Sequence, residues 1–470
     1  MTETRLAWLA GMTMLVLGLW GWATGMPWVM LLPALAGVVG LAFFRLDLLF
    51  ATLIFLVPLS VNLAEFGWTS VGWYMPTEPL LFGLMVLWAI RAIRGQSVKP
   101  SFVRHPIALL VAASFVWMGL TILPSAHPVV SLKAWIARGW FLAAFFFMMG
   151  EWLGANEKNR ERLVALLVVP MLMVCAYTLV RHAGLGFGKA AGHWVMKPFF
   201  RDHTSYGAIL AMLLPPAVAL FWRDKQGLFQ KVLWALAVAF LTVATVLSYT
   251  RAAWVSLVVA FGLWVAIKLG FKLRTLVVAG VVAVGTLFLG WDALVIRLEQ
   301  NDQASSDNLA QHIQSISNVT NDDSNLERLN RWSCAWNMFL DRPVFGWGAG
   351  TYQFEYAGFQ TSQLRTNIST NNADLGNAHS EYLGPLAEQG LLGLVGILAL
   401  LGATLHWGFK LQRTLKQGND KRLAMAMFLG LITYFVHGIM NNFLDTDKAS
   451  APFWGFLAVL VLLDLKAQED

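Results

Sequence analysis

A titratable histidine lies where a polar segment meets a long apolar run, in LGNAHSEYLGPLAEQG, residues 375–390. The unperturbed pKa of an imidazole is near 6.5, so a neutral His379 could accept a proton from a hydroxyl group at neutral pH. A histidine at the start of a helix can also be a cap or an interface residue. The sequence therefore presents His379 either as a candidate general base or as a structural residue.

Four cations lie on the side of the membrane where positive charge is disfavoured. They are Arg138 in LKAWIARGWFLAAFF, Lys197 and Arg201 before TSYGAILAMLL, and Arg251 in the short turn LSYTRAAWVSL. Charge at the edge of a bilayer is costly, so its presence suggests a function. The alternatives for any one of them are a side chain that extends to the interface and a structural salt bridge.

Arginine suits phosphate because its planar guanidinium donates two charge-assisted hydrogen bonds and stays protonated. Arg201 and Arg251 together could hold a lipid-linked diphosphate at the membrane–water boundary. The same pair would stabilise the charge that develops on a diphosphate leaving group. Arg138 and Lys197 are candidate supporting residues.

The segment that follows His379 carries an acid inside an apolar run. Glu388 is expected to be a buried partner for an arginine, with a proton relay as the alternative, and the glycines at 390, 393 and 396 suggest close helix packing. His437 and Asp445 flank the outer end of the next span and are expected to support the site. His312, Asp322 and Asp323 lack a recognisable ligand spacing, so neither a metal nor a cofactor is expected.

Composition indicates a membrane protein. Of 470 residues, 57% are hydrophobic and 13% charged, and the mean hydropathy is +0.59. The apolar residues form runs of about 16 to 22, the length that crosses a hydrocarbon core. The net charge of +7 arises from basic clusters in alternate loops, as the positive-inside rule requires, so no nucleic-acid partner is expected. We predict an all-α polytopic membrane protein, a bundle of about 12–14 transmembrane helices with a large, partly helical periplasmic loop.

Three regions follow from this pattern: an N-terminal transmembrane bundle over 1–293, a large periplasmic loop over 294–378, and C-terminal transmembrane helices over 379–470. An even number of spans places both termini in the cytoplasm. The predicted spans lie near 6–23, 28–44, 47–64, 78–93, 106–123, 132–152, 162–180, 204–222, 232–249, 252–268, 275–293, 380–407, 423–443 and 450–465.

The second half of the predicted loop contains a helical stripe. Leu329, Trp332, Trp336 and Phe339 follow one another at helical spacing, and Pro343 ends the pattern. One interpretation is an external helix that packs this apolar side on the membrane domain. The other is a wall that binds an acceptor substrate.

Four segments, in this order along the chain, resemble those of the O-antigen ligase/polymerase superfamily, most closely the WaaL-type O-antigen ligases. They are FFRDHTSYGAIL, SYTRAAW, RWSCAWNMFLDRPVFGWGAGTY and NAHSEYLGPLAEQGLLG. The resemblance extends to many spans and a large loop before the last three. Two departures, alanine after Arg251 and HSEYL where His-Asn is common, leave ligase and polymerase open.

The resemblance implies a metal-independent, inverting glycosyltransferase without a cofactor. Its donor would be a glycan on undecaprenyl diphosphate and its acceptor lipid A–core, at the periplasmic face of the bacterial inner membrane. Arg201 and Arg251 match the family's diphosphate-binding arginines, and His379 matches its catalytic histidine. Alternatives are an O-antigen polymerase and, from another class, a lipid or solute transporter. The absence of evident repeat halves and the charges gathered at one face favour an enzyme over a transporter.

Overall fold

The structure is a computed structural model that describes residues 12–13, 16–25, 31–67, 72–96, 98–289, 323–364, 369 and 376–469. The chain divides into two compact units, Met1–Leu56 and Val57–Asp470. The predicted loop residues His312 and Asp322 lie outside the described residues. The boundaries at 293/294 and 378/379 stay predictions.

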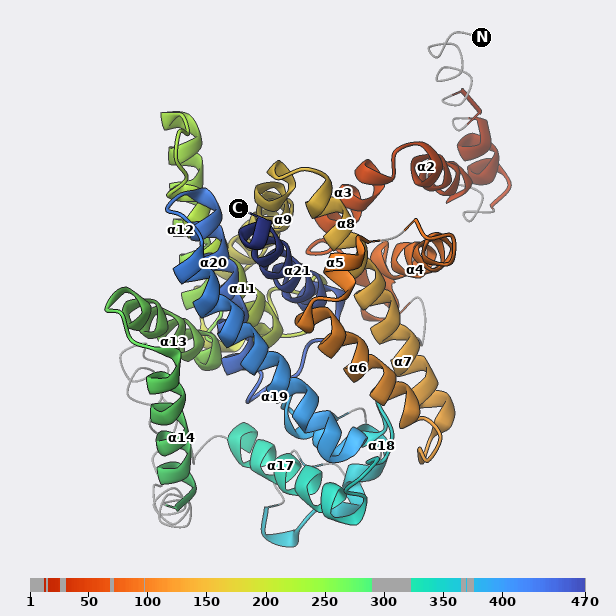
Figure 1. The fold of residues 1–470 in the computed structure, drawn as a ribbon. Coiled ribbons are helices and arrows are strands. Elements are labelled where there is room, and N and C mark those ends of the chain that lie inside the picture. The colour runs from red at the N-terminus through yellow and green to blue at the C-terminus, as the bar shows by residue number, and fades with distance from the viewer. Residues whose placement is uncertain are drawn as a thin grey trace. The chain divides into compact units, whose positions relative to one another are not determined.

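Helices make up nearly all of the regular structure in the described residues (Figure 1). Unit 1 contains α2 (Leu31–Phe44) and α3 (Leu46–Leu56). In unit 2 the strands are β1 (Val61–Asn62) and β2 (Tyr74–Met75), which pair antiparallel. The helices of unit 2 are η2 (Leu63–Phe66), α4 (Thr77–Ile93), α5 (Pro100–Val103), α6 (Pro106–Leu120), α7 (Pro128–Leu142), η3 (Ala143–Met148), α8 (Met149–Ala155), α9 (Lys158–Ala183), α10 (Lys189–Gly192), α11 (His203–Phe221), α12 (Leu228–Leu247), α13 (Arg251–Lys268), α14 (Leu273–Leu289), α17 (Asp323–Asp341), α18 (Tyr352–Glu355), η4 (Tyr356–Phe359), η5 (Ser362–Leu364), α19 (Leu383–Thr414), α20 (Asn419–His437) and α21 (Asp447–Glu469).

Seven helical segments in the described part of the chain are long and apolar enough to cross a membrane. They are the continuous segment Pro128–Ala155 and the helices α9, α11, α12, α13, α19 and α21. Four shorter apolar helices accompany them. The predicted class, an all-α polytopic membrane protein, is confirmed, whereas the count of spans stays a prediction.

One predicted span ends earlier than expected. The run predicted over 47–64 is helical only to Leu56, and the short β1–β2 hairpin follows. Pro58 lies two residues after the helix end, and because proline lacks an N–H it cannot continue the backbone ladder. An apolar composition alone does not reveal this stop.

The centre of unit 2 is formed by α11, α20 and α21, which pack against one another and against α13 (Figure 1). Glycine permits the closest approaches. A Cβ at Gly207 of α11 would lie 2.6 Å from the Cβ of Thr250, which precedes α13. A Cβ at Gly430 of α20 would lie 2.6 Å from the carbonyl oxygen of Met212 in α11. Small residues let helix backbones approach closely in membranes, so these contacts fix α11 between α13 and α20.

A break in α19 positions the loop that precedes it. Gly390 has φ +69° and ψ −162°, outside the helical region, and a Cβ there would lie 2.2 Å from the carbonyl oxygen of Val344. The segment 343–348 inserts at this point. Its Trp347 and Gly348 N–H groups donate to the carbonyls of Ala387 and Glu388 at 3.1 and 2.8 Å. The backbone groups released by the break are thereby satisfied, and the loop is fixed to the helix.

The helix predicted from the stripe is present as α17, but the interpretation that the stripe is its packed face is wrong, whereas the acceptor-binding wall stays a prediction. Trp336 is 50% exposed, whereas Cys334, Ala335 and Met338 are buried. These three pack in one cluster with Tyr352, Tyr356, Ala378 and Ala387. The loop thus has a core of its own, made by residues after α17, and this core selects a face different from the aromatic stripe.

Candidate active site

The segment that carries His379 is held by α17. Arg331 donates from Nη1 to the carbonyl oxygen of Asn377 at 3.1 Å and from Nε to Glu327 at 2.8 Å. The Tyr352 hydroxyl donates to the Arg331 carbonyl at 2.7 Å. A Cβ at Gly376 would lie 1.9 Å from the Arg331 guanidinium, so only glycine fits beside it. The helix of the loop therefore supports the polar approach to the histidine.

His379 itself adopts a left-handed backbone conformation, with φ +48°. This conformation is uncommon for a residue other than glycine and is maintained only where the surroundings fix it. The His379 N–H donates to Asn377 Oδ1 at 3.1 Å, and the Trp332 indole N–H reaches the His379 carbonyl at 3.5 Å. Backbone strain of this kind gathers at functional sites, which supports a role for His379 beyond helix capping.

Glu381 fastens the same segment to the connection between α20 and α21. Its Oε1 accepts hydrogen bonds from the Phe443 N–H at 2.7 Å, the Leu444 N–H at 3.0 Å and the Tyr434 hydroxyl. The Glu381 N–H donates to the Gly438 carbonyl at 2.8 Å. One buried carboxylate thus accepts from two N–H groups of the turn and from a hydroxyl group of α20.

Replacing Glu381 with alanine is expected to destabilise the protein by about 2–4 kcal/mol, because three donors lose their acceptor in a buried turn. The thermal midpoint in detergent should fall clearly below that of the wild type. Glu355→Ala is the matched control, since in the described part of the chain the Glu355 carboxylate has one side-chain hydrogen bond, with His127 at 2.9 Å, and is partly exposed. Equal losses in the two variants would contradict the anchoring role.

The packing of α11 on α13 brings residues next to Arg201 and Arg251 into contact. Thr250, the residue before Arg251, donates from its hydroxyl to the carbonyl of His203 at 2.7 Å, two residues after Arg201. Tyr249 has a left-handed φ of +51°, and its hydroxyl donates to Phe187. The turn before α13 is therefore fixed against the start of α11.

Asp202, between Arg201 and α11, is the N-cap of that helix. Its side chain accepts from the Ser205 N–H at 2.8 Å and from the Thr204 hydroxyl at 2.6 Å. Burial would raise the pKa of Asp202, but these hydrogen bonds and the nearby His203 outweigh it and lower the pKa. Asp202 stays ionised and fixes the backbone that presents Arg201.

A cavity of about 350 Å³ lies between α7, the start of α19 and the connection from α20 to α21. Arg138, Arg201 and Glu388 line it, and so do Ala378 and Ser380, the two neighbours of His379. Asn442 and Asp445 also line it. His379 and Arg251 do not line the cavity themselves, and Arg251 is connected to it through Arg201 and the Thr250–His203 contact.

Two guanidinium groups in this cavity are available for a ligand. In the part of the chain that the structure describes, Arg138 and Arg201 each line the cavity without a hydrogen bond or ion pair to another side chain. Asp445 also lines the cavity and interacts electrostatically with both arginines. Burial and the neighbouring Glu381 raise the pKa of Asp445 to about 6, while Arg138 and Arg201 lower it. The cavity therefore offers cations for an anion and polar groups for hydroxyls.

The structure places Glu388 and Lys197 differently from the expectation. Glu388 was expected to pair with an arginine, but the partner that it has is the Tyr352 N–H, at 3.1 Å. The break at Gly390 brings this loop backbone to the carboxylate, so a backbone donor takes the arginine's place. Lys197 pairs with Glu65 at 3.1 Å and does not line the cavity.

The charge state of His379 depends on burial and on α17. Burial, together with the nearby Arg331 and Arg328, lowers the pKa of His379 to about 4, although Asp202 partly opposes this shift. The imidazole is therefore neutral throughout the neutral pH range.

Several site residues were not singled out from the sequence. Arg331 and Glu327 have the i, i+4 spacing of a helical ion pair, and Asp202 stands where an N-cap is expected before TSYGAIL. Both patterns can be read from the sequence alone. Asn442, by contrast, lines the cavity with a buried Oδ1 that lacks a partner, and nothing in its sequence context indicates it.

Other polar groups have different surroundings. Expected as a supporting residue, His437 is buried in α20, and neither of its ring nitrogens has a hydrogen-bond partner in the described structure. Cys175 and Cys334 are both buried, and they are not joined in a disulfide. Among the described residues, no three His, Cys, Asp or Glu side chains gather closely enough to hold a metal ion.

Comparison with known proteins identifies the segment that contains most of these elements. Residues 236–398 match the family model described as O-antigen ligase, a match that includes Arg251, α17, His379 and Glu388. No curated protein matches the chain. The match covers about a third of the chain and includes three of the four segments noted in the sequence, and it supports their resemblance to the O-antigen ligase/polymerase superfamily.

Proposed function

We propose that the protein is an O-antigen ligase that transfers a glycan from undecaprenyl diphosphate to lipid A–core. The observation that carries the proposal is the cavity. Arg138 and Arg201 line it without an ion pair to any described residue, and so do the two neighbours of a fixed, neutral histidine. Guanidinium groups suit a diphosphate, and Asp445, Asn442 and Glu388 suit sugar hydroxyls. The family match supports a membrane glycosyltransferase.

The proposed reaction is a direct displacement. His379 takes the proton from an acceptor sugar hydroxyl, and the oxygen attacks the anomeric carbon of the donor. The bond between that carbon and the diphosphate oxygen breaks, and its electron pair leaves on the diphosphate. Arg201 and Arg251 stabilise the negative charge that develops there, and the anomeric configuration inverts. The mechanism requires no metal ion.

The orientation follows from the basic loops. Both termini would lie in the cytoplasm of a bacterium, the protein would span the inner membrane, and the cavity would face the periplasm. Membrane lipids surround the helices. The lipid-linked donor would reach the cavity from the bilayer, and the acceptor would approach beside the loop that carries α17.

Binding of the donor is also expected to change the pKa of His379. With burial holding the pKa of free His379 at about 4, the imidazole is a weak base. Negative charge from a bound diphosphate favours the imidazolium and raises this pKa. Protonation removes the base, so rates fall as pH falls through the pKa. The acidic limb of kcat, which reports the complex, is therefore expected at higher pH than that of kcat/KM, which reports the free enzyme.

Rates of transfer measured from pH 4 to pH 8 at saturating and at low donor test this shift. Asp445→Asn is the control, because the pKa of Asp445, about 6, could produce a limb in the same range. The shift should persist in that variant. If the acidic limbs of the kcat and kcat/KM profiles lay at the same pH, the donor would not raise the pKa of His379.

Reconstitution tests the function itself. The purified full-length protein is incubated with a defined undecaprenyl-diphosphate-linked glycan and lipid A–core in liposomes, and the products are separated by mass. A ligase yields glycan-bearing lipid A–core and free undecaprenyl diphosphate. A lengthened lipid-linked glycan would identify a polymerase instead, and movement of the donor across the bilayer without a covalent product would identify a transporter.

A further inference from the structure

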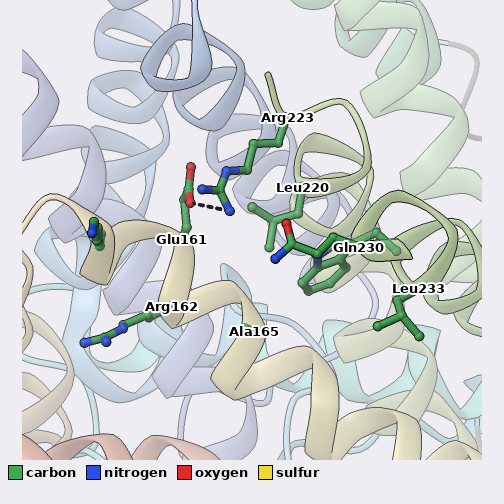
Figure 2. Close-up of a pocket in the computed structure, with 9 residues that line it drawn as sticks. Glu161, Arg162, Ala165, Leu220, Arg223, Gln230 and Leu233 are labelled. Carbon is green, nitrogen blue, oxygen red and sulfur yellow. Dashed lines mark ion pairs between the residues drawn. The ribbon is translucent and has the colours of Figure 1, made fainter. Parts of the chain in front are cut away.

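A second cavity, of about 310 Å³, lies far from the candidate active site. It is formed by the start of α9, the end of α11 and the start of α12, together with Arg223 just beyond α11 (Figure 2). Arg201 and Arg223 flank opposite ends of α11, a helix of 19 residues. At 1.5 Å per residue the helix is about 28 Å long, close to the thickness of a hydrocarbon core.

The polar rim of this cavity carries excess positive charge. Lys158, Arg162 and Arg223 line it with a single acid, Glu161. Figure 2 shows Arg223 directed at Glu161, and the two side chains form an ion pair at 3.2 Å. The ion pair leaves two exposed cations. Arg162 reaches only the amide oxygen of Asn159, at 3.3 Å, and the Lys158 ammonium has no ion-pair partner in the described part of the chain.

Apart from Gln230, the remainder of the lining is apolar. Leu220 of α11 and Leu233 and Trp234 of α12 lie on the inner side of the cations, and Leu233 is 49% exposed. Beyond the cavity, Leu228 and Phe229 at the start of α12 are 79% and 75% exposed. A cationic rim next to exposed apolar surface matches the two parts of a phospholipid, a charged head group and an acyl chain.

We propose that this cavity binds an anionic phospholipid from the surrounding bilayer, with its phosphate at Lys158 and Arg162 and an acyl chain along Leu220 and Leu233. A soluble phosphate would gain nothing from the apolar lining, whereas an acyl chain removes that surface from water. The site lies at the end of the bundle where the predicted cytoplasmic loops lie, and the cytoplasmic leaflet is anionic. The proposal does not depend on the reaction at the other end of the helices.

Native mass spectrometry of the purified full-length protein in nonionic detergent tests the site. Phosphatidylglycerol and phosphatidylcholine with identical acyl chains are titrated separately. We expect one phosphatidylglycerol to bind at least tenfold more tightly than phosphatidylcholine. Lys158→Gln with Arg162→Gln should weaken phosphatidylglycerol binding by about tenfold or more and leave phosphatidylcholine binding unchanged.

The matched control is Lys268→Gln with Arg274→Gln, which removes the same charge from exposed residues of α13 and α14 that do not line the cavity. This variant should retain phosphatidylglycerol binding. An equal loss in both double variants would overturn the proposal in favour of diffuse attraction. Displacement of the lipid by low millimolar inorganic phosphate would assign the site to a soluble anion. All variants should keep the wild-type thermal midpoint without added lipid.

Discussion

Replacing His379 with alanine is expected to reduce glycan transfer by about 10²–10⁴-fold, the range in which a positioned general base contributes. The acceptor hydroxyl would then have to lose its proton to water. His379→Asn keeps a polar side chain of similar size without a group that ionises near neutral pH, and it should be equally defective. Initial rates with lipid-linked donor and lipid A–core measure the effect.

Folding must be separated from chemistry in these variants. The left-handed backbone at residue 379 suits asparagine better than alanine, so His379→Asn is expected to keep the wild-type thermal midpoint. His127→Ala is the control histidine, since His127 contacts Glu355 and does not line the cavity. Full transfer activity in folded His379→Asn would exclude the general-base role.

The second large effect concerns the arginines. Arg201→Ala is expected to lower kcat by about 10²–10³-fold, because a donor aimed at developing charge is lost. Lysine should restore little of this rate, since it presents a point charge in place of a fork. Because Arg201 is exposed and lines the cavity without an ion pair in the described structure, its loss should leave the thermal midpoint unchanged.

Arg251 requires a comparison of two variants. It has interactions within the fold, so Arg251→Ala is expected to combine lower kcat with some loss of stability. Arg251→Lys keeps the charge at the start of α13 and separates the two effects. Lys189→Ala, in α10, is the control for general loss of positive charge and should transfer at the wild-type rate. Wild-type transfer rates in both Arg201→Ala and Arg251→Ala would exclude the proposed role of these two arginines in holding the diphosphate.

The two arginines are expected to differ in their dependence on the donor. Arg201 lines the cavity, whereas Arg251 is linked to it only through the Thr250–His203 contact. If Arg251 acts only when the donor has entered, its loss should affect kcat more than KM. The lining of the cavity therefore supports diphosphate binding directly for Arg201, and for Arg251 only through the Thr250–His203 contact.

The helices follow from local sequence because each needs only an apolar run of sufficient length and a boundary. The runs predicted near 204–222 and 252–268 are α11 and α13, within a residue at either end. Arg201 and Arg251 stand out for the same local reason, since each cation precedes an apolar helix. His379 stands out because a polar segment meets an apolar one at that position.

Tertiary structure decided the partners of these residues. Glu388 bonds to a backbone N–H because segment 343–348 inserts at Gly390, and Lys197 pairs with Glu65 across 132 positions of sequence. The buried face of α17 was likewise chosen by later residues of the loop. Hydropathy and helical period describe single segments. They therefore cannot specify which face of a helix packs against which distant segment.

From the sequence alone follow the all-α membrane class, the approximate bounds of the main helices and three candidate site residues, Arg201, Arg251 and His379. Only the folded chain decided that Arg138, Asn442 and Asp445 share a cavity with Arg201. It also decided that Glu381 and Arg331 hold the histidine segment from two sides. The physical reason is that hydrogen bonds and cavities form between segments far apart in the chain, and their geometry arises from packing.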